Sequence, residues 1–261
     1  MSKLLVRSSG PDVDGCLVRI TPESAGWRYV GFEAYRLEDG MPVAREFTER
    51  ETCVVILSGR VHATAGDHVW RDAGGRTTVF EGPPTALYVP PATSWSVEAA
   101  GDAEIAVCTA PAAEGAELRL LGPDDVRHES RGSGGEAREI AHILMEDAPA
   151  EALLVTEVVT PAGHWSSYPP HKHDDDDPPR ETYLEETYYH RLRPANGFAF
   201  QRVYTADGSL DESLAVGDGD VVLVPAGYHP VAAGARHDLY YLNVMAGPRR
   251  EWRVTVDPDF A

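Results

Sequence analysis

The sequence predicts an all-β protein made of two tandem barrels. Twenty prolines and 24 glycines divide the 261 residues into short apolar stretches. These stretches are rich in Val, Tyr and Ile, which fit a pleated, half-buried strand. Sustained helical periodicity is hard to find. Many short strands separated by turn residues are typical of a β-sandwich or barrel.

The expected strands follow from the apolar stretches in chain order. They cover residues 30–35, 52–57, 85–89, 104–109, 152–160, 187–192, 198–204, 221–224 and 239–244. Turn residues separate each from the next. Only residues 123–127 indicate a helix, and a short one.

Both halves of the chain follow one order of elements. In the first half, Glu51 precedes an apolar strand, and the chain later turns at residues 89–95. In the second half, Glu186 precedes a strand, and a similar proline turn occupies residues 224–229. Each turn is expected to aim one residue back at the barrel interior.

A glycine-rich linker, residues 131–136, separates the two halves. It predicts an N-terminal barrel over residues 1–130 and a C-terminal barrel over residues 131–261. Residues 47–50 and 93–95 contain no histidine where the second half has several. We therefore expect the N-terminal barrel to be free of metal and to supply packing and subunit contacts.

Composition narrows the function. Asp and Glu outnumber Lys and Arg by 42 to 23, giving a net charge of −19. So acidic a surface repels nucleic acid and anionic membranes, and an anionic substrate would need a local cationic pocket. The sequence shows no helix-turn-helix or basic patch for DNA.

Cysteine usage and the N-terminus favour the cytoplasm. Cys16, Cys53 and Cys108 are scattered, with no CxxC spacing, so free buried thiols are expected. The apolar run at residues 4–6 is too short for a signal peptide. No window approaches the roughly twenty apolar residues that span a bilayer.

A pair of histidines gives the strongest functional signal. His171 and His173 flank one residue, so on an extended segment both point to the same face. A carboxylate and His229, from the later proline turn, could complete a metal site. Imidazole with carboxylate suits Zn, Mn, Fe, Ni or Co better than Ca or Mg.

Longer motifs surround these histidines. They occupy residues 167–174, 181–191, 197–205 and 240–248. With the repeated proline turns they resemble the cupin superfamily and, within it, the 5-deoxy-glucuronate isomerase family of myo-inositol catabolism. The resemblance covers the whole chain, although its specific motifs lie in the second half.

This resemblance implies two tandem cupin barrels, that is, double-stranded β-helices or jelly rolls. It also implies an intramolecular oxidoreductase that interconverts 5-deoxy-D-glucuronate and 5-dehydro-2-deoxy-D-gluconate, an aldose–ketose isomerisation. The alternatives are an isomerase of another deoxy-uronate, a cupin metal-dependent oxygenase, and a sugar-binding regulatory bicupin. Oxygen uptake would identify the oxygenase. The implied partners are a small sugar acid and, in a homo-oligomer, further copies of the chain.

By the same resemblance, His171 and His173 correspond to the paired cupin ligands and His229 to the late one. The gap before the acid is longer than in ordinary cupins, so three carboxylates compete. They are Glu181, Glu185 and Glu186. We favour Glu186, because ligand acids of cupins usually open a strand with a tyrosine two or three positions on.

Other residues are candidates for catalysis and substrate binding. Glu185, His190 or a metal-bound water is expected to be the base, although His190 could equally be a core histidine. Arg202, beside Gln201, is our first choice for the substrate carboxylate, although an ion pair with an acid competes with that role. Tyr241 and Asn243 share a face and could hold sugar hydroxyls. The acidic run 174–177 predicts a surface loop.

Overall fold

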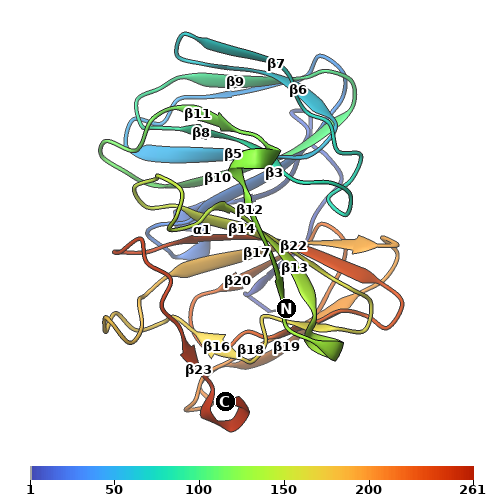
Figure 1. The fold of residues 1–261 in the computed structure, drawn as a ribbon, viewed down its shortest axis with the longest axis vertical. Coiled ribbons are helices and arrows are strands. Elements are labelled where there is room, and N and C mark those ends of the chain that lie inside the picture. The colour runs from blue at the N-terminus through green and yellow to red at the C-terminus, as the bar shows by residue number, and fades with distance from the viewer. Residues whose placement is uncertain (1) are drawn as a thin grey trace. The chain divides into compact units, whose positions relative to one another are not determined.

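The computed structural model describes residues 2–261, and the chain is nearly all β, with 48% strand and 5% helix (Figure 1). The predicted all-β class is confirmed. Within the described part, no helix is long and apolar enough to cross a membrane. The helical pieces are α1 (Pro22–Ala25) and three 3-10 turns, Pro123–Asp125, Gly134–Glu136 and Pro258–Phe260.

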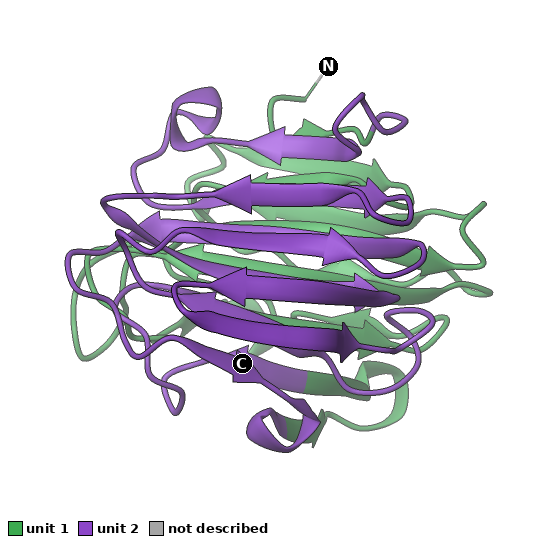
Figure 2. Ribbon diagram, turned by 90° about the horizontal axis from the view of Figure 1, so that it is seen from above, with its two compact units in different colours: residues 1–8, 128–140, 156–261 green, residues 9–127, 141–155 purple. Residues whose placement is uncertain are grey.

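Two compact units make up the chain (Figure 2). Unit 1 contains the residues up to Ser8, residues 128–140 and residues 156–261. Unit 2 contains residues 9–127 and 141–155. Each unit therefore includes a short segment from the other half of the chain.

Unit 2 encloses its core between two antiparallel sheets. One has the order β11-β8-β5-β10-β3-β2 and the other β4-β9-β6-β7. Val54, Ile105 and Val97 come from both sheets and pack in one buried cluster. The strands are β2 (Cys16–Ile20), β3 (Gly31–Leu37), β4 (Pro42–Arg45), β5 (Arg50–Ser58), β6 (Arg60–Ala65), β7 (His68–Gly74), β8 (Thr85–Val89), β9 (Trp95–Ala99), β10 (Ala103–Pro111) and β11 (Arg119–Leu121).

Unit 1 is built in the same manner. Its large sheet has the order β1-β20-β17-β22-β14-β13-β12, in which residues 127, 141–144 and 154–155 are part of unit 2. Its smaller sheet has the order β15-β21-β18-β19, and β16 pairs with β23. Tyr188, Val203 and Tyr241 belong to its buried cluster. The strands are β1 (Leu5–Val6), β12 (Arg127–Arg131), β13 (Arg138–Leu144), β14 (Leu154–Thr160), β15 (Trp165–Ser166), β16 (His171–Lys172), β17 (Glu185–Arg193), β18 (Ala199–Tyr204), β19 (Asp211–Val216), β20 (Val221–Val224), β21 (Val231–Ala232), β22 (Asp238–Ala246) and β23 (Thr255–Val256).

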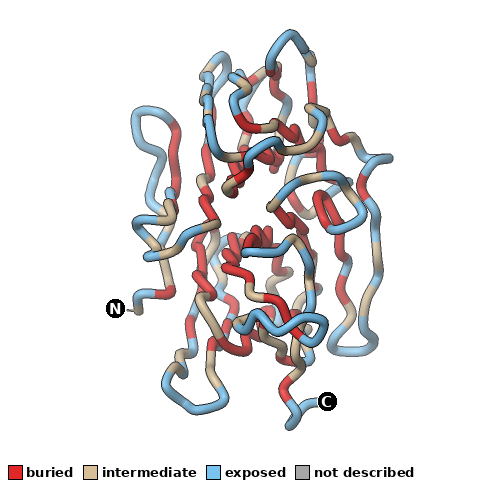
Figure 3. Tube along the Cα trace, turned by 90° about the vertical axis from the view of Figure 1, so that its left-hand side faces the viewer, coloured by how far each residue is buried: buried red, intermediate tan, exposed pale blue. Residues whose placement is uncertain are grey.

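Burial alternates along strands of the smaller sheets, such as β6 and β18, as expected when one face meets solvent. Strands of the large sheets, such as β5, β17 and β22, are buried almost throughout (Figure 3). Each predicted strand is found with small shifts at its ends. One shift has a clear cause: β14 begins at Leu154 because the amides of Ala152 and Leu153 donate instead to Glu51, at 2.7 and 2.6 Å. The predicted helix at 123–127 is only the 3-10 turn Pro123–Asp125.

Candidate metal centre

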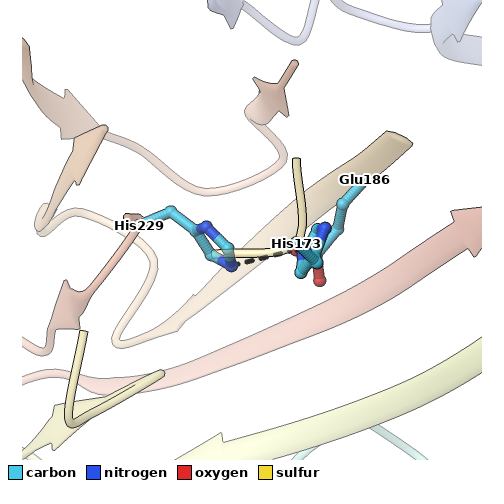
Figure 4. A group of neighbouring side chains, drawn as sticks. All are labelled: His173, Glu186 and His229. Carbon is cyan, nitrogen blue, oxygen red and sulfur yellow. Dashed lines mark hydrogen bonds and ion pairs between the residues drawn. The ribbon is translucent and has the colours of Figure 1, made fainter. Parts of the chain in front are cut away.

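Three buried side chains of unit 1 converge on one point (Figure 4). His173, Glu186 and His229 each offer a ligand atom, and these atoms lie within 4.8 Å of one another. Glu186 Oε2 is 3.0 Å from His173 Nε2 and 3.2 Å from His229 Nε2. Glu186 comes from β17, His173 directly follows β16, and His229 follows the proline turn after β20.

Backbone carbonyls fix which nitrogen of each imidazole faces the centre. His173 Nδ1 donates to the Leu184 carbonyl at 3.0 Å, and His229 Nδ1 donates to the Gly227 carbonyl at 2.8 Å. In a neutral ring the Nε2 atom then carries the lone pair. Both Nε2 lone pairs therefore point at a carboxylate, which is itself only an acceptor. A cation between them resolves this conflict, and His229 Nε2 has no hydrogen-bond partner among the described residues.

The electrostatics favour positive charge at the same point. Burial alone would lower the pKa of His173, but the close, negatively charged Glu186 raises it above the ordinary value. Burial opposes ionisation of Glu186, yet the close contacts with His173 and His229 lower its pKa to about 2. The carboxylate is thus ionised, and the donor set fits a divalent transition metal.

His171 borders this group. Its ring centroid lies 4.9 Å from that of His229 and 6.5 Å from that of His173. Its Nδ1 donates to the Pro169 carbonyl at 3.2 Å, so its Nε2 also carries a lone pair. Burial, and then the neighbouring imidazoles, lower its pKa to about 3, which keeps the ring neutral. The structure therefore places His173 in the converging group and His171 at its edge, beside His229.

The competing carboxylates lie elsewhere. Glu181 Oε1 accepts from Lys172 Nζ at 2.9 Å and from the amides of Asp174 and Asp175 at 2.8 and 2.9 Å. Glu185 precedes Glu186 on β17, so its side chain points to the opposite face of the sheet. Of the three acids, the structure brings only Glu186 to the histidines.

The acidic run after the histidine pair is ordered by its own contacts. Asp174 forms an ion pair with Lys172, and its Oδ2 accepts from the Gly227 amide at 2.8 Å. The Gly227 carbonyl in turn accepts from His229. Gly227 has φ +89°, and a Cβ there would lie 2.4 Å from the Tyr204 carbonyl oxygen, so only glycine fits. Asp174 thus fixes the turn that orients His229.

Comparison with known proteins decides the family. A model described as the KduI/IolB family matches residues 4–261. The chain belongs to this family. It is 51% identical to the 5-deoxy-glucuronate isomerase of Geobacillus kaustophilus over 99% of this chain and 94% of that protein. It is 42% identical to the one of Bacillus subtilis strain 168, over 92% and 89%. The resemblance found in the sequence is confirmed.

Solved structures agree on the fold of this KduI/IolB-family chain. An IolB-like protein from Salmonella typhimurium LT2 superposes with a TM-score of 0.96 at 46% identity, covering 99% of this chain and 98% of that one. An oxalate decarboxylase from Lactobacillus farciminis superposes with a TM-score of 0.66 at 13% identity, covering 98% and 89%. The second likeness shows the fold alone, and the two tandem cupin barrels are confirmed.

His190 lies deeper in the family's C-terminal barrel than we expected. It is four residues beyond Glu186 on β17, or about 13 Å along the strand. The Tyr188 ring contacts both His190 and His229, with centroid distances of 5.9 and 5.7 Å. His190 Nε2 lies 2.9 Å from Gln201 Oε1, and burial lowers the pKa of His190 to about 4. The structure brings neither His190 nor Gln201 beside the centre.

Arg202 faces outward. Side chains alternate on β18, so Gln201 is buried while Arg202 is exposed. Its guanidinium binds Asp211 through two hydrogen bonds of 2.8 Å. Arg202 therefore forms the ion pair with an acid that we considered as the alternative. The structure does not bring Arg202 to the barrel interior.

Tyr241 and Asn243 do line the interior. The Tyr241 hydroxyl lies 2.6 Å from Ser166 Oγ, and its ring centroid is 5.0 Å from that of Tyr188. The Asn243 side chain is buried beside the Tyr188 hydroxyl, and its amide has two N–H donors. Both positions suit the predicted contact with hydroxyl groups.

Two features near Tyr188 and Tyr241 were not predicted from the sequence. Ser167 adopts φ +49°, rare for a residue with a side chain, and its Oγ lies 3.0 Å from the Tyr188 hydroxyl. Arg138, the first residue of β13, is buried. The prolines after Tyr168 indicated an irregular segment, but nothing in the sequence marked Arg138 as buried.

Proposed function

We propose that this chain is a metal-dependent isomerase that converts 5-deoxy-D-glucuronate to 5-dehydro-2-deoxy-D-gluconate. The observation that carries the proposal is the convergence of imidazole lone pairs on the ionised Glu186 carboxylate. The names of relatives at 42% and 51% identity support the substrate and the aldose–ketose reaction.

His171, His173, Glu186 and His229 would hold the ion, which we expect to be Zn, Mn, Fe, Ni or Co. Their Nδ1–carbonyl hydrogen bonds support this assignment, because such contacts hold metal-binding imidazoles in one orientation. When bound, a divalent ion supplies Lewis-acid stabilisation of the negative charge that develops on oxygen as a carbon-bound proton is removed.

The chain's own residues would orient the sugar and exclude water. Tyr188 keeps its proton, because burial and the charge of Glu186 raise its pKa well above the ordinary value. Its hydroxyl and Asn243 Nδ2 are therefore donors for substrate oxygens. Glu185 faces away and His190 lies beyond Tyr188, so we assign neither of them the role of proton-transfer base.

The test combines elemental analysis of the purified protein with an NMR assay on 5-deoxy-D-glucuronate. We expect stoichiometric transition metal, isomerisation without oxygen uptake, and loss of activity on chelation. Re-addition of one of the five metals should restore it. A protein that isomerises at full rate when stripped of metal, or that consumes oxygen on turnover, would refute the proposal.

A further inference from the structure

Arg138 carries a buried positive charge in unit 1. It opens β13, and its residue is only 7% exposed. Ile140, two positions on, belongs to the core cluster of the barrel. Because strand side chains alternate, Arg138 faces the same interior as Ile140.

The partners that the structure describes for this guanidinium are neutral. Its Nη1 donates to the Glu136 carbonyl at 2.8 Å and its Nη2 to the Tyr168 carbonyl at 3.0 Å. Among residues 2–261, no carboxylate forms an ion pair with Arg138. Guanidinium has five N–H donors, so several remain for a ligand. A buried charge without a counter-charge is costly and calls for an anionic partner.

The contrast with other arginines of the chain is instructive in so acidic a protein. Many of them are paired with a carboxylate, including Arg127, Arg131, Arg180, Arg191, Arg193, Arg202 and Arg249. With 42 acids in the chain, a counter-ion for Arg138 would be easy to supply. Because no carboxylate among the described residues pairs with Arg138, its guanidinium is suited to an anionic ligand.

A short segment connects Arg138 to the metal centre. The Tyr168 carbonyl accepts from Arg138, and the next carbonyl, of Pro169, accepts from His171 Nδ1. By standard backbone dimensions, the guanidinium therefore lies within about 12 Å of the His171 ring. A six-carbon chain is about 6 Å long, and a coordination bond at one end with a hydrogen bond at the other brings the span to about 11 Å.

The wall between these two ends is polar. Ser166 and Ser167 precede Tyr168 and contact the hydroxyls of Tyr241 and Tyr188, respectively. The Tyr241 hydroxyl is within electrostatic reach of both Arg138 and Glu186, which shift its pKa in opposite directions. Hydroxyl groups of an extended sugar would meet these side chains along the way.

We propose that Arg138 binds the carboxylate of a sugar acid whose carbonyl end lies at the His173–Glu186–His229 group. This inference rests on the proposed function and names the residue that selects an acid over a neutral sugar. Arg138 thus provides the cationic pocket that the net charge of −19 demands, in place of Arg202.

The experiment compares Arg138→Met and Arg138→Lys with the wild type on two substrates. One is 5-deoxy-D-glucuronate, and the other is 5-deoxy-D-glucose, in which an alcohol replaces the carboxylate. Loss of a charge-assisted contact should raise KM for the acid on the order of 10- to 100-fold in Arg138→Met. Its kcat/KM for the neutral sugar should change less than threefold. Arg138→Lys, which keeps the charge without the planar fork, should fall between.

Arg202→Met is the matched control, because it removes a surface arginine that is already paired with Asp211. It should leave both substrates unaffected. An unchanged KM for the acid in Arg138→Met, or equal losses on both substrates with a lowered melting temperature, would overturn the inference. If Arg138→Met does not fold, Arg138→Lys decides in the same way.

Calorimetric binding of 5-deoxy-D-glucuronate to the same metal-loaded proteins separates the two proposals. A wild type that binds the acid through Arg138 without isomerising it would refute the proposed function and leave this inference standing. Normal isomerisation by the wild type, with unaltered binding of the acid in the Arg138 variants, would refute this inference and leave the proposed function standing. A wild type that does not bind the acid would refute both.

Discussion

The two units place different residues at equivalent positions of one fold. In unit 2, Thr52 pairs with Val89, the residue before the proline turn. In unit 1, Glu186 pairs with Val224, which also precedes its proline turn. Thr52 is therefore the counterpart of Glu186. The same backbone presents a hydroxyl in one barrel and, in the other, the carboxylate that we propose holds the metal.

The next inner positions continue the contrast. Val54 and Ile56 of β5 correspond to Tyr188 and His190 of β17. In unit 2 these side chains pack in an apolar cluster together with Trp95, which follows the proline turn there as His229 follows the proline turn of unit 1. The barrel geometry fixes where side chains meet, and only their chemistry decides whether the meeting point is core or a site.

The acids that open the two strands also differ. Glu51 is the counterpart of Glu185, so it faces away from the interior of its barrel. Its carboxylate accepts from the amides of Glu151, Ala152 and Leu153 at 2.9, 2.7 and 2.6 Å. Glu51 is thus a structural acid, whereas Glu186 belongs to the centre.

The largest expected effect comes from removing the acid at the centre. Glu186→Gln should lower isomerase activity on the order of 1000-fold and reduce bound metal, because one anionic ligand is lost. The fold should survive, because Gln has nearly the shape of Glu and the packing around the imidazoles is kept. Thr52→Ala, at the equivalent position, should leave metal content unchanged. Full metal occupancy in Glu186→Gln, by elemental analysis, would break the comparison.

Removing the structural acid should have the opposite profile. Glu51→Ala should destabilise the protein by about 4 kcal/mol, because buried amides lose a charged acceptor. Urea unfolding measures this loss. The folded fraction should bind metal as the wild type does. If Glu51→Ala has the same midpoint of urea unfolding as the wild type, Glu51 does not have the structural role assigned to it.

The deep histidine gives a pH-dependent difference between the barrels. Burial depresses the folded pKa of His190 to about 4, below an unfolded value near 6.5, so only the unfolded chain takes up this proton as pH falls. Stability should therefore decrease by about 3 kcal/mol between pH 6.5 and 4 from this residue alone.

The double variant His190→Ile/Gln201→Ala installs Ile56 and Ala63 of unit 2; Ala63 pairs with Val97 after its proline turn as Gln201 pairs with Val231 after the other. Chemical unfolding at several pH values should show that this slope is reduced relative to the wild type. An identical slope in both proteins would show that His190 does not contribute to it.

The smallest effect concerns the orientation of His229. Asp174→Ala removes the acceptor of the Gly227 amide and should weaken metal affinity 10- to 100-fold, roughly the range for residues that orient a ligand. Asp174→Asn keeps an acceptor oxygen and should lose much less. Asp176→Ala, whose partner Arg249 is exposed, is the control. Equal affinities for Asp174→Ala and Asp176→Ala in a competition titration would contradict this role.

Much of this comparison could be predicted from the sequence. The alternation of apolar strands and turns gave the all-β class, and the spacing of His171, His173 and His229 gave the histidines of the centre. Aligning the two halves by sequence alone was wrong in one respect. Glu51-Thr52 resembles Glu186-Thr187, but strand pairing shows a shift of one residue, which reverses the face of every side chain.

The remainder depended on long-range packing. Arg202 and Gln201 are adjacent in sequence, and only the pleat shows which one enters the barrel. His190 is separated from the centre by the length of strand between it and Glu186. The period of two predicts which face a side chain is on, but not how far along the strand the site extends. Arg138 lies outside the motifs, and its burial arises from contacts with residues 136 and 168.

The most direct test of the central claim is a crystal structure of the metal-loaded protein, with anomalous scattering measured at the edge of the bound element. We predict one peak in unit 1, about 2.0–2.3 Å from the Nε2 atoms of His171, His173 and His229 and from a Glu186 oxygen. An ion bound instead by the acidic run 174–177, or Nε2 atoms that turn away from the peak, would contradict the account.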